Sequence, residues 1–129
     1  MDKQIFRKWE PLSDLPDEMY LEGLHDDYEG FRLLLKGASG NRKMLRISFD
    51  SSLAYRNINE GDFLKTVEDS EGLTKWCLFT VENSAYEKWF HEQSYNIHAS
   101  EDIVHYAIYT PNDCVDILSA YPPQVEWLN

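Results

Sequence analysis

Two stretches of alternating apolar residues, joined by a glycine-rich segment, constrain the possible folds of this chain more than any other feature. In both stretches every second residue is large and apolar, at Phe31, Leu33, Leu35, Leu45, Ile47 and Phe49. Successive side chains of a strand point to opposite faces, so a period of two places all six on one buried face. Residues 37–41, GASGN, tolerate the positive φ angles of tight turns. The pattern predicts an antiparallel hairpin.

Further strands are expected where short apolar runs alternate with turn-forming residues. We predict them at residues 19–24, 63–67, 76–81, 105–110 and 114–119, with 53–56 continuing the second strand of the hairpin and 121–128 docked at the end. The segment HDDYEG, residues 25–30, is interpreted as a turn. The fold class predicted is α+β: a mainly antiparallel sheet of about five or six strands with one long helix packed on it. The length fits a single domain over residues 1–129.

The predicted helix covers about residues 84–94. Ser84, followed three residues later by Glu87, forms a capping-box pattern that satisfies two free amides at a helix start. Tyr86, Trp89 and Phe90 recur at helical spacing. We therefore expect this aromatic face to pack on the sheet.

Net charge is the strongest bulk signal, because 23 acidic and 12 basic residues give a formal charge of −11. Such a surface repels the phosphates of nucleic acids and of anionic membranes, so neither is expected as a partner. The same charge favours a basic protein partner, because opposite potentials speed encounter. Solubility alone explains an acidic composition equally well.

The compartment expected is the cytoplasm. The first ten residues, MDKQIFRKWE, lack the apolar run of a signal peptide. No segment approaches the roughly 20 apolar residues of a membrane helix. Cys77 and Cys114 are far apart in the sequence and are expected to be buried thiols in a reducing environment.

No catalytic or metal-binding motif stands out. The histidines His25, His91, His98 and His105 have no metal-ligand spacing. Cys114 follows His105 in sequence, but the neighbouring Asp113 and Asp116 disfavour a thiolate. We expect no metal and no cofactor, and we favour a binding protein over an enzyme.

A basic segment interrupts the acidic chain. Residues 10–29 hold eight acids and no Lys or Arg, residues 32–56 hold six basic residues and one acid, and no Lys or Arg follows Lys88. The outer face of the predicted hairpin then carries Arg32, Lys36, Arg42, Arg46, Leu34 and Met44. Three interpretations stay open: a solvated face with arginine stems over the apolar residues, internal neutralisation of the acidic segment, or one end of a bipolar binding surface.

Four stretches together carry a family resemblance: LRISFDSSLAYRNINEGD, FTVENSAYEKWFHEQS, HYAIYTPNDCVDILS and YPPQVEWL. Over residues 28–128 the chain resembles a group of small, mostly uncharacterised bacterial proteins. In size and charge it also resembles the small acidic immunity proteins encoded beside polymorphic or contact-dependent toxins, which implies binding to a toxin domain. The resemblance assigns no role to individual residues. Arg56, four residues before Glu60, is interpreted as an ion pair that clamps a turn.

Two classes of function follow. The first is an immunity-type protein that covers the active site of a basic toxin domain, such as a nuclease, with acidic surface and aromatic anchors. Its candidate partner-binding residues are Asp14, Asp17, Glu18, Glu22, Asp26, Asp27, Glu29, Asp113, Asp116 and Glu126. The alternative is a small ligand-binding domain or enzyme with a pocket between sheet and helix, lined by Trp76, Tyr86, Trp89, His105 and Tyr109. A homodimer through a sheet edge is compatible with either.

Overall fold

The computed structural model describes residues 3–37, 43–63, 66 and 76–128, which build two antiparallel sheets. Its elements in chain order are β1 Ile5–Lys8, β2 Met19–Asp27, β3 Gly30–Gly37, β4 Met44–Phe49, β5 Ser52–Asn59, the 3-10 turn η1 Glu60–Asp62, β6 Leu78–Glu82, α2 Ala85–Gln93, β7 Val104–Tyr109, β8 Asp113–Ser119 and β9 Gln124–Leu128. Among the described residues strands dominate beside one α-helix, which confirms the predicted α+β class. The predicted strand number is wrong, because the described residues form nine strands in two sheets.

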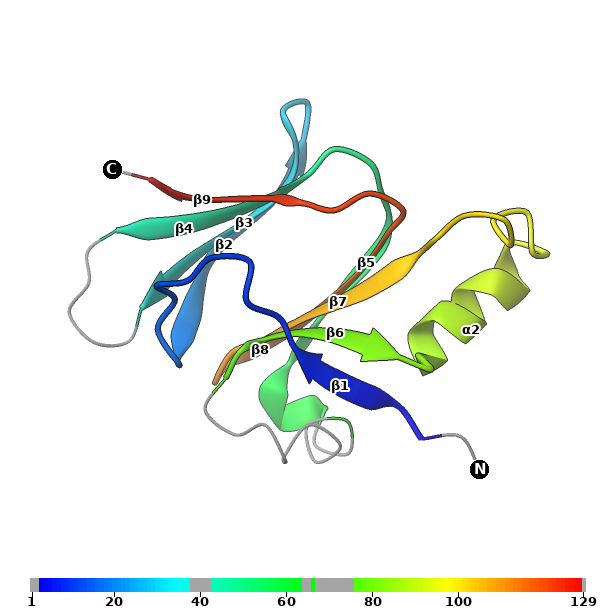
Figure 1. Cartoon of the computed structure of the whole chain (residues 1–129), viewed down its shortest axis with the longest axis horizontal. Coiled ribbons are helices and arrows are strands. Elements are labelled where there is room, and N and C mark those ends of the chain that lie inside the picture. Colours follow the sequence, from blue (N-terminus) through cyan, green and yellow to red (C-terminus); the bar gives the residue numbers. More distant parts are fainter. Residues whose placement is uncertain (1–2, 38–42, 64–65, 67–75, 129) are drawn as a thin grey trace.

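The division into two sheets explains why the predicted number of strands is too low. The strand order is β1-β6-β7-β8-β5 in the five-stranded sheet and β2-β3-β4-β9 in the four-stranded sheet. A bend at Asp50 and Ser51 takes the chain from β4 in one sheet to β5 in the other (Figure 1). The sequence pattern predicts instead that residues 53–56 continue the second strand of the hairpin. The sequence also gives no signal for the short strand β1. Only Phe6 of its four residues is buried, so apolar and polar residues do not alternate along it.

Several predicted segments differ from the structure in their bounds or lie outside the described residues. Phe63 follows η1 and is not in a strand, while Leu64, Lys65 and Val67 of the predicted strand lie outside the described residues. The same holds for residues 38–41 of the hairpin loop and for Arg42. The HDDYEG turn is shorter than predicted, since β2 continues to Asp27.

The core lies between the two sheets. β3 pairs with β4 so that Leu33 is opposite Ile47 and Leu35 is opposite Leu45, and all six predicted apolar residues of this hairpin are buried. The five-stranded sheet adds Leu78, Tyr106, Ile108, Val115 and Ile117. A second cluster lies on the face that points away from the four-stranded sheet. It combines Phe6 of β1 with the intervening residues of β6, β7 and β8: Phe79, Val81, Ala107, Tyr109 and Cys114. Burial of this apolar surface supplies the main driving force for folding.

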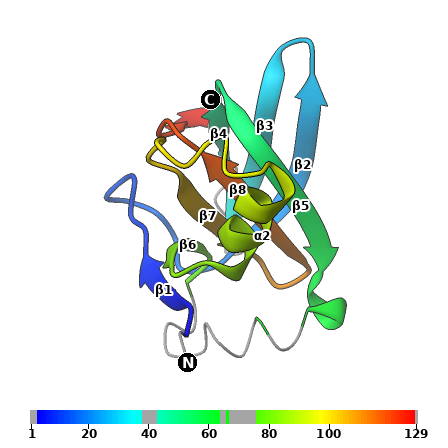
Figure 2. The same cartoon turned by 90° about the vertical axis from the view of Figure 1, so that its right-hand side faces the viewer.

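Helix α2 begins as predicted. Ser84 Oγ accepts a hydrogen bond from the Glu87 backbone amide at 2.9 Å, and the Gln4 side chain accepts from the Ala85 amide. The helix crosses the face of the five-stranded sheet that points away from the other sheet (Figure 2). Tyr86 is the one buried residue of α2, whereas Trp89 is exposed. The predicted packing of the aromatic face on the sheet is therefore confirmed for Tyr86 and wrong for Trp89, because the helix contacts the sheet through its first turn.

Candidate functional site

The β2–β3 hairpin ends in a tight turn of two residues. Asp27 pairs with Gly30, and Tyr28 and Glu29 form the loop between them. The Asp27 side chain accepts a hydrogen bond from the Glu29 amide at 2.9 Å, and Gly30 adopts a φ of 105°. Aspartate before the turn and glycine after it are the residues that such a turn favours. The sequence therefore fixes the geometry of the tip.

The tip combines an aromatic ring with carboxylates. Tyr28 is fully exposed. Arg32 Nη1 lies 2.8 Å from Asp27 Oδ1, and its Nη2 lies 3.6 Å from Glu29 Oε2. The hydrogen bond from Arg32 lowers the pKa of Asp27. Asp26 accepts a hydrogen bond from Tyr55 OH at 3.1 Å. Three carboxylates and one guanidinium leave the tip negative.

The structure separates the other predicted acids. Asp17, Glu18 and Glu22 are exposed before and within β2, Asp14 accepts a hydrogen bond from Trp127 Nε1 at 3.2 Å, and Asp113 is half-buried. Glu126 pairs with Arg46. Asp116 is completely buried, so its prediction as a partner-binding residue is wrong. The acids therefore do not form one surface.

The basic segment neutralises acids within the molecule. Arg32 pairs with the hairpin tip, Arg46 with Glu126, and Arg56 Nε lies 2.8 Å from Asp116 Oδ2. Arg32, Lys36, Arg46, Leu34 and Met44 share the outer face of the four-stranded sheet, as the alternation predicts. The proposed pairing of Arg56 with Glu60 is wrong, because β5 places Arg56 opposite Asp116 on β8.

A buried polar network joins α2 to the five-stranded sheet. Ser84 Oγ lies 2.7 Å from His105 Nδ1, and His105 Nε2 lies 2.6 Å from Asp116 Oδ1. Tyr109 OH donates to the same Asp116 oxygen at 2.7 Å. Ser84, His105 and Asp116 are each at most 3% exposed. The Arg56 guanidinium lies over the Tyr86 ring at 4.2 Å from its centroid.

The partners of Asp116 in this network favour its ionised form. Burial by itself would raise the pKa of Asp116, but hydrogen bonds and charges from His105 and Arg56 outweigh burial and lower it. Burial and the Asp116 charge raise the pKa of Tyr109. An ionised Asp116 accepts from Arg56, His105 and Tyr109, and the other nitrogen of His105 pairs with the Ser84 hydroxyl. Each polar group has a partner, as burial requires.

Serine, histidine and aspartate in series are also the groups of a nucleophilic triad. A nucleophile must reach a substrate, however, and Ser84 is buried while its oxygen accepts the helix-capping hydrogen bond. Tyr86 packs against His105, with ring centroids 5.7 Å apart. The arrangement holds the start of α2 on the sheet, and this structural role accounts for each of its contacts.

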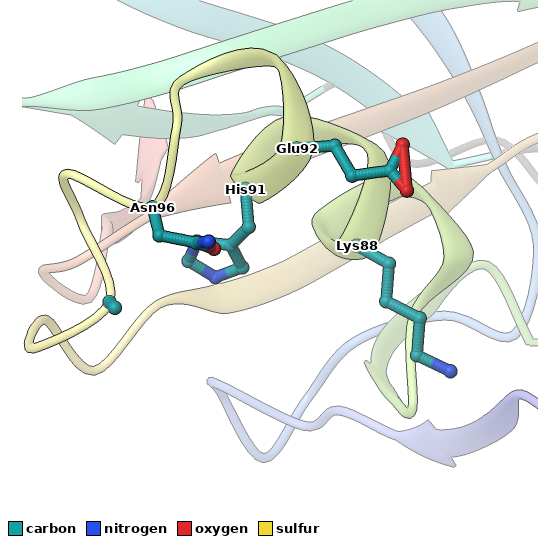
Figure 3. A pocket seen from close by; sticks show the side chains of 5 residues that line it. Lys88, His91, Glu92 and Asn96 are labelled. Atoms are coloured by element: carbon teal, nitrogen blue, oxygen red, sulfur yellow. The ribbon is translucent and has the colours of Figure 1, made fainter.

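The structure places the five residues of the predicted pocket in different surroundings. Tyr86, His105 and Tyr109 are buried within the network, Trp89 is exposed on α2, and Trp76 packs beside both core clusters and donates to the Trp9 carbonyl. A shallow hollow of about 440 Å³ lies elsewhere on α2, lined by Lys88, His91, Glu92, Asn96 and Ala99 (Figure 3). Its lining mixes both signs of charge.

The described part of the chain contains no group of side chains arranged for metal binding or thiol chemistry. There, no group of three or more His, Cys, Asp or Glu side chains could hold a metal ion. Cys77 and Cys114 are free and buried, and burial raises the pKa of each thiol to about 12. Within the same residues, no helix combines the length and apolar character needed to traverse a bilayer.

The sequence analysis does not predict the pairing of Asp116 with Arg56 and His105. The one available signal was Asp116 itself, an acid in the middle of the apolar run CVDILS. A buried acid requires a partner, although the sequence does not identify it. The chain matches no family model, no curated protein and no solved structure.

Proposed function

We propose that the protein is a cytoplasmic binding protein that recognises a basic protein domain through the tip of its β2–β3 hairpin, in the manner of an immunity protein that neutralises a toxin such as a nuclease. One observation carries the proposal: Tyr28 is fully exposed between carboxylates on a hairpin whose turn is fixed by Asp27, Gly30 and Arg32. The hairpin extends beyond the rest of both sheets (Figure 2).

The physical argument is preorganisation. Aromatic anchors dominate many interfaces, and a tyrosine supplies a large contact area for the loss of few rotatable bonds. Because the hairpin register and turn are already fixed, binding orders little additional backbone. Carboxylates around the ring attract the cationic groups with which a nuclease binds phosphate. The alternative pocket has no comparable support, because the rings of Tyr86, His105 and Tyr109 pack within the network.

The test begins with affinity capture from the native host, with wild type, Tyr28→Ala and Glu29→Gln as parallel baits. Tyr121→Ala is the matched control, since Tyr121 is also an exposed tyrosine but lies in the β8–β9 connection. We avoid Asp27, because its side chain shapes the turn. A basic protein retained by wild type and the control, but lost with Tyr28→Ala, supports the proposal.

Binding kinetics with the captured protein complete the test. Tyr28→Ala is expected to weaken binding by about 2 kcal/mol or more, mainly through faster dissociation. Glu29→Gln is expected to slow association and to reduce its dependence on salt. Equal binding by wild type and Tyr28→Ala would exclude the hairpin tip. An acidic captured partner would exclude the immunity-type function.

A further inference from the structure

Helix α2 and the loop that follows it expose three large apolar side chains. Trp89 is 52% exposed, Tyr95 90% and Ile97 74%. They lie within nine residues, and α2 with its following loop forms one end of the molecule (Figure 1). We name Trp89, Tyr95 and Ile97 the helix–loop surface. Exposed apolar side chains gathered in this way mark interaction sites more often than scattered ones do.

The buried network supports the helix end of this surface. The Trp89 ring stacks on Tyr86, with centroids 5.9 Å apart and planes at 17°. Tyr86 in turn lies under the Arg56 guanidinium, which is paired with Asp116. These contacts link the exposed indole to the completely buried Asp116. The indole is held in place before any partner arrives, which lowers the entropy cost of binding.

The loop end is held in an unfavourable backbone conformation. Tyr95 and Asn96 have φ angles of 50° and 59°, in the left-handed region that is costly for a tyrosine. Several contacts maintain it: the Asn96 amide donates to the His91 carbonyl at 2.9 Å, and Ser94 Oγ donates to the Phe90 carbonyl at 2.8 Å. His98 stacks on Phe90 with centroids 5.3 Å apart. The conformation turns the Tyr95 ring to solvent, although asparagine would fit the backbone better.

Acidic side chains outnumber basic ones along this part of the chain, where Lys88 is the basic residue next to Trp89. No Lys or Arg follows Lys88 in the sequence, whereas Glu92 and Asp102 are exposed beside the three apolar residues in sequence. Lys88 borders the shallow hollow on α2, where Glu92 and Asn96 also lie (Figure 3). Apolar anchors with acidic surroundings complement a segment that presents apolar side chains between cationic ones.

We propose that the helix–loop surface is a docking site for a cationic amphipathic segment of a partner protein, separate from the β2–β3 hairpin. The apolar residues of the segment cover Tyr95 and Ile97 and contact Trp89, while its Lys or Arg side chains approach Glu92 and Asp102. This site acts independently of the hairpin tip, so either proposal stands without the other.

The probe is a synthetic amphipathic helical peptide of leucine and lysine, with a leucine–glutamate peptide as its control. Binding is measured by the change in tryptophan fluorescence and mapped by NMR on the full chain. Tyr95→Asn combined with Ile97→Ser removes the apolar groups, and asparagine relieves the backbone conformation, so the variant should fold at least as well. Tyr28→Ser is the matched control at the hairpin.

The expected result is binding of the lysine peptide that weakens as salt rises, with NMR shifts at Trp89, Tyr95 and Ile97. The double variant should bind at least about tenfold more weakly, and Tyr28→Ser should bind as wild type does. Equal binding of both peptides, loss of binding with Tyr28→Ser alone, or no binding of the lysine peptide would overturn the proposal. Concentration-dependent dimerisation that the double variant abolishes would assign the surface to a second copy of the chain instead.

Discussion

Replacing Asp116 by asparagine tests the buried network most directly. The carboxylate accepts from His105 Nε2 at 2.6 Å, from Tyr109 OH at 2.7 Å and from Arg56 Nε at 2.8 Å. Asparagine has nearly the same shape but offers one oxygen and one NH₂ group. If the asparagine oxygen accepts hydrogen bonds from His105 and Tyr109, its NH₂ group faces the Arg56 guanidinium. Both of these groups are donors, so no hydrogen bond forms between them.

The expected cost is about 2–4 kcal/mol. A hydrogen bond to a charged group contributes about 1.5–3 kcal/mol, and removing one partner of a fully buried ion pair costs about 3–5 kcal/mol. The value here should lie below the upper limit, because the Arg56 side chain is 35% exposed and can turn to water. Urea unfolding followed by tryptophan fluorescence measures the change, with an unchanged m-value as the sign of an intact fold.

Glu126→Gln is the matched control, because it removes the same kind of charge from an exposed ion pair with Arg46. It should change the free energy of unfolding by no more than about 1 kcal/mol. An Asp116→Asn variant as stable as Glu126→Gln would refute the structural role of the network.

The pH dependence adds a second criterion. The folded pKa of Asp116 lies below its unfolded value of about 3.9, so ionised Asp116 stabilises the fold above that pH. This stabilisation is lost as pH falls through the folded pKa. The stability difference between wild type and Asp116→Asn should therefore be constant at neutral pH and narrow below about pH 4.

Three further predictions concern Ser84 and Gly30. Ser84→Ala should lower the free energy of unfolding by about 0.5–2 kcal/mol, near the upper end because His105 also loses a partner; a loss under about 0.3 kcal/mol in urea unfolding would contradict this. A fluorophosphonate probe, which labels active-site serines, should leave Ser84 unmodified in the native protein by mass spectrometry, and stoichiometric labelling would assign Ser84 a catalytic role instead. Gly30→Ala should cost about 1–3 kcal/mol in thermal or urea unfolding because of the φ of 105°, and a neutral result would show that the turn adopts another conformation.

Local patterns in the sequence determined the elements of this protein. The alternation from Phe31 to Phe49 set the buried face of β3 and β4, because the strand period of two leaves one choice once a face is apolar. Ser84 set the start of α2, because its hydroxyl satisfies a backbone amide within the same turn. Both effects act over a few residues, so a single sequence is sufficient to predict them.

The tertiary structure alone decided which charges meet between distant segments. Arg56 has Glu60 nearby in sequence, yet its partner Asp116 is 60 residues away, because β5 and β8 are neighbours in the sheet. The same pairing removed Asp116 from the set of surface acids, and the Arg32 contact reduced the charge of the hairpin tip. Charge along a sequence predicts the sign of a surface only for residues that remain exposed. Strand order determines that exposure, and it depends on how the apolar faces of distant segments pack together.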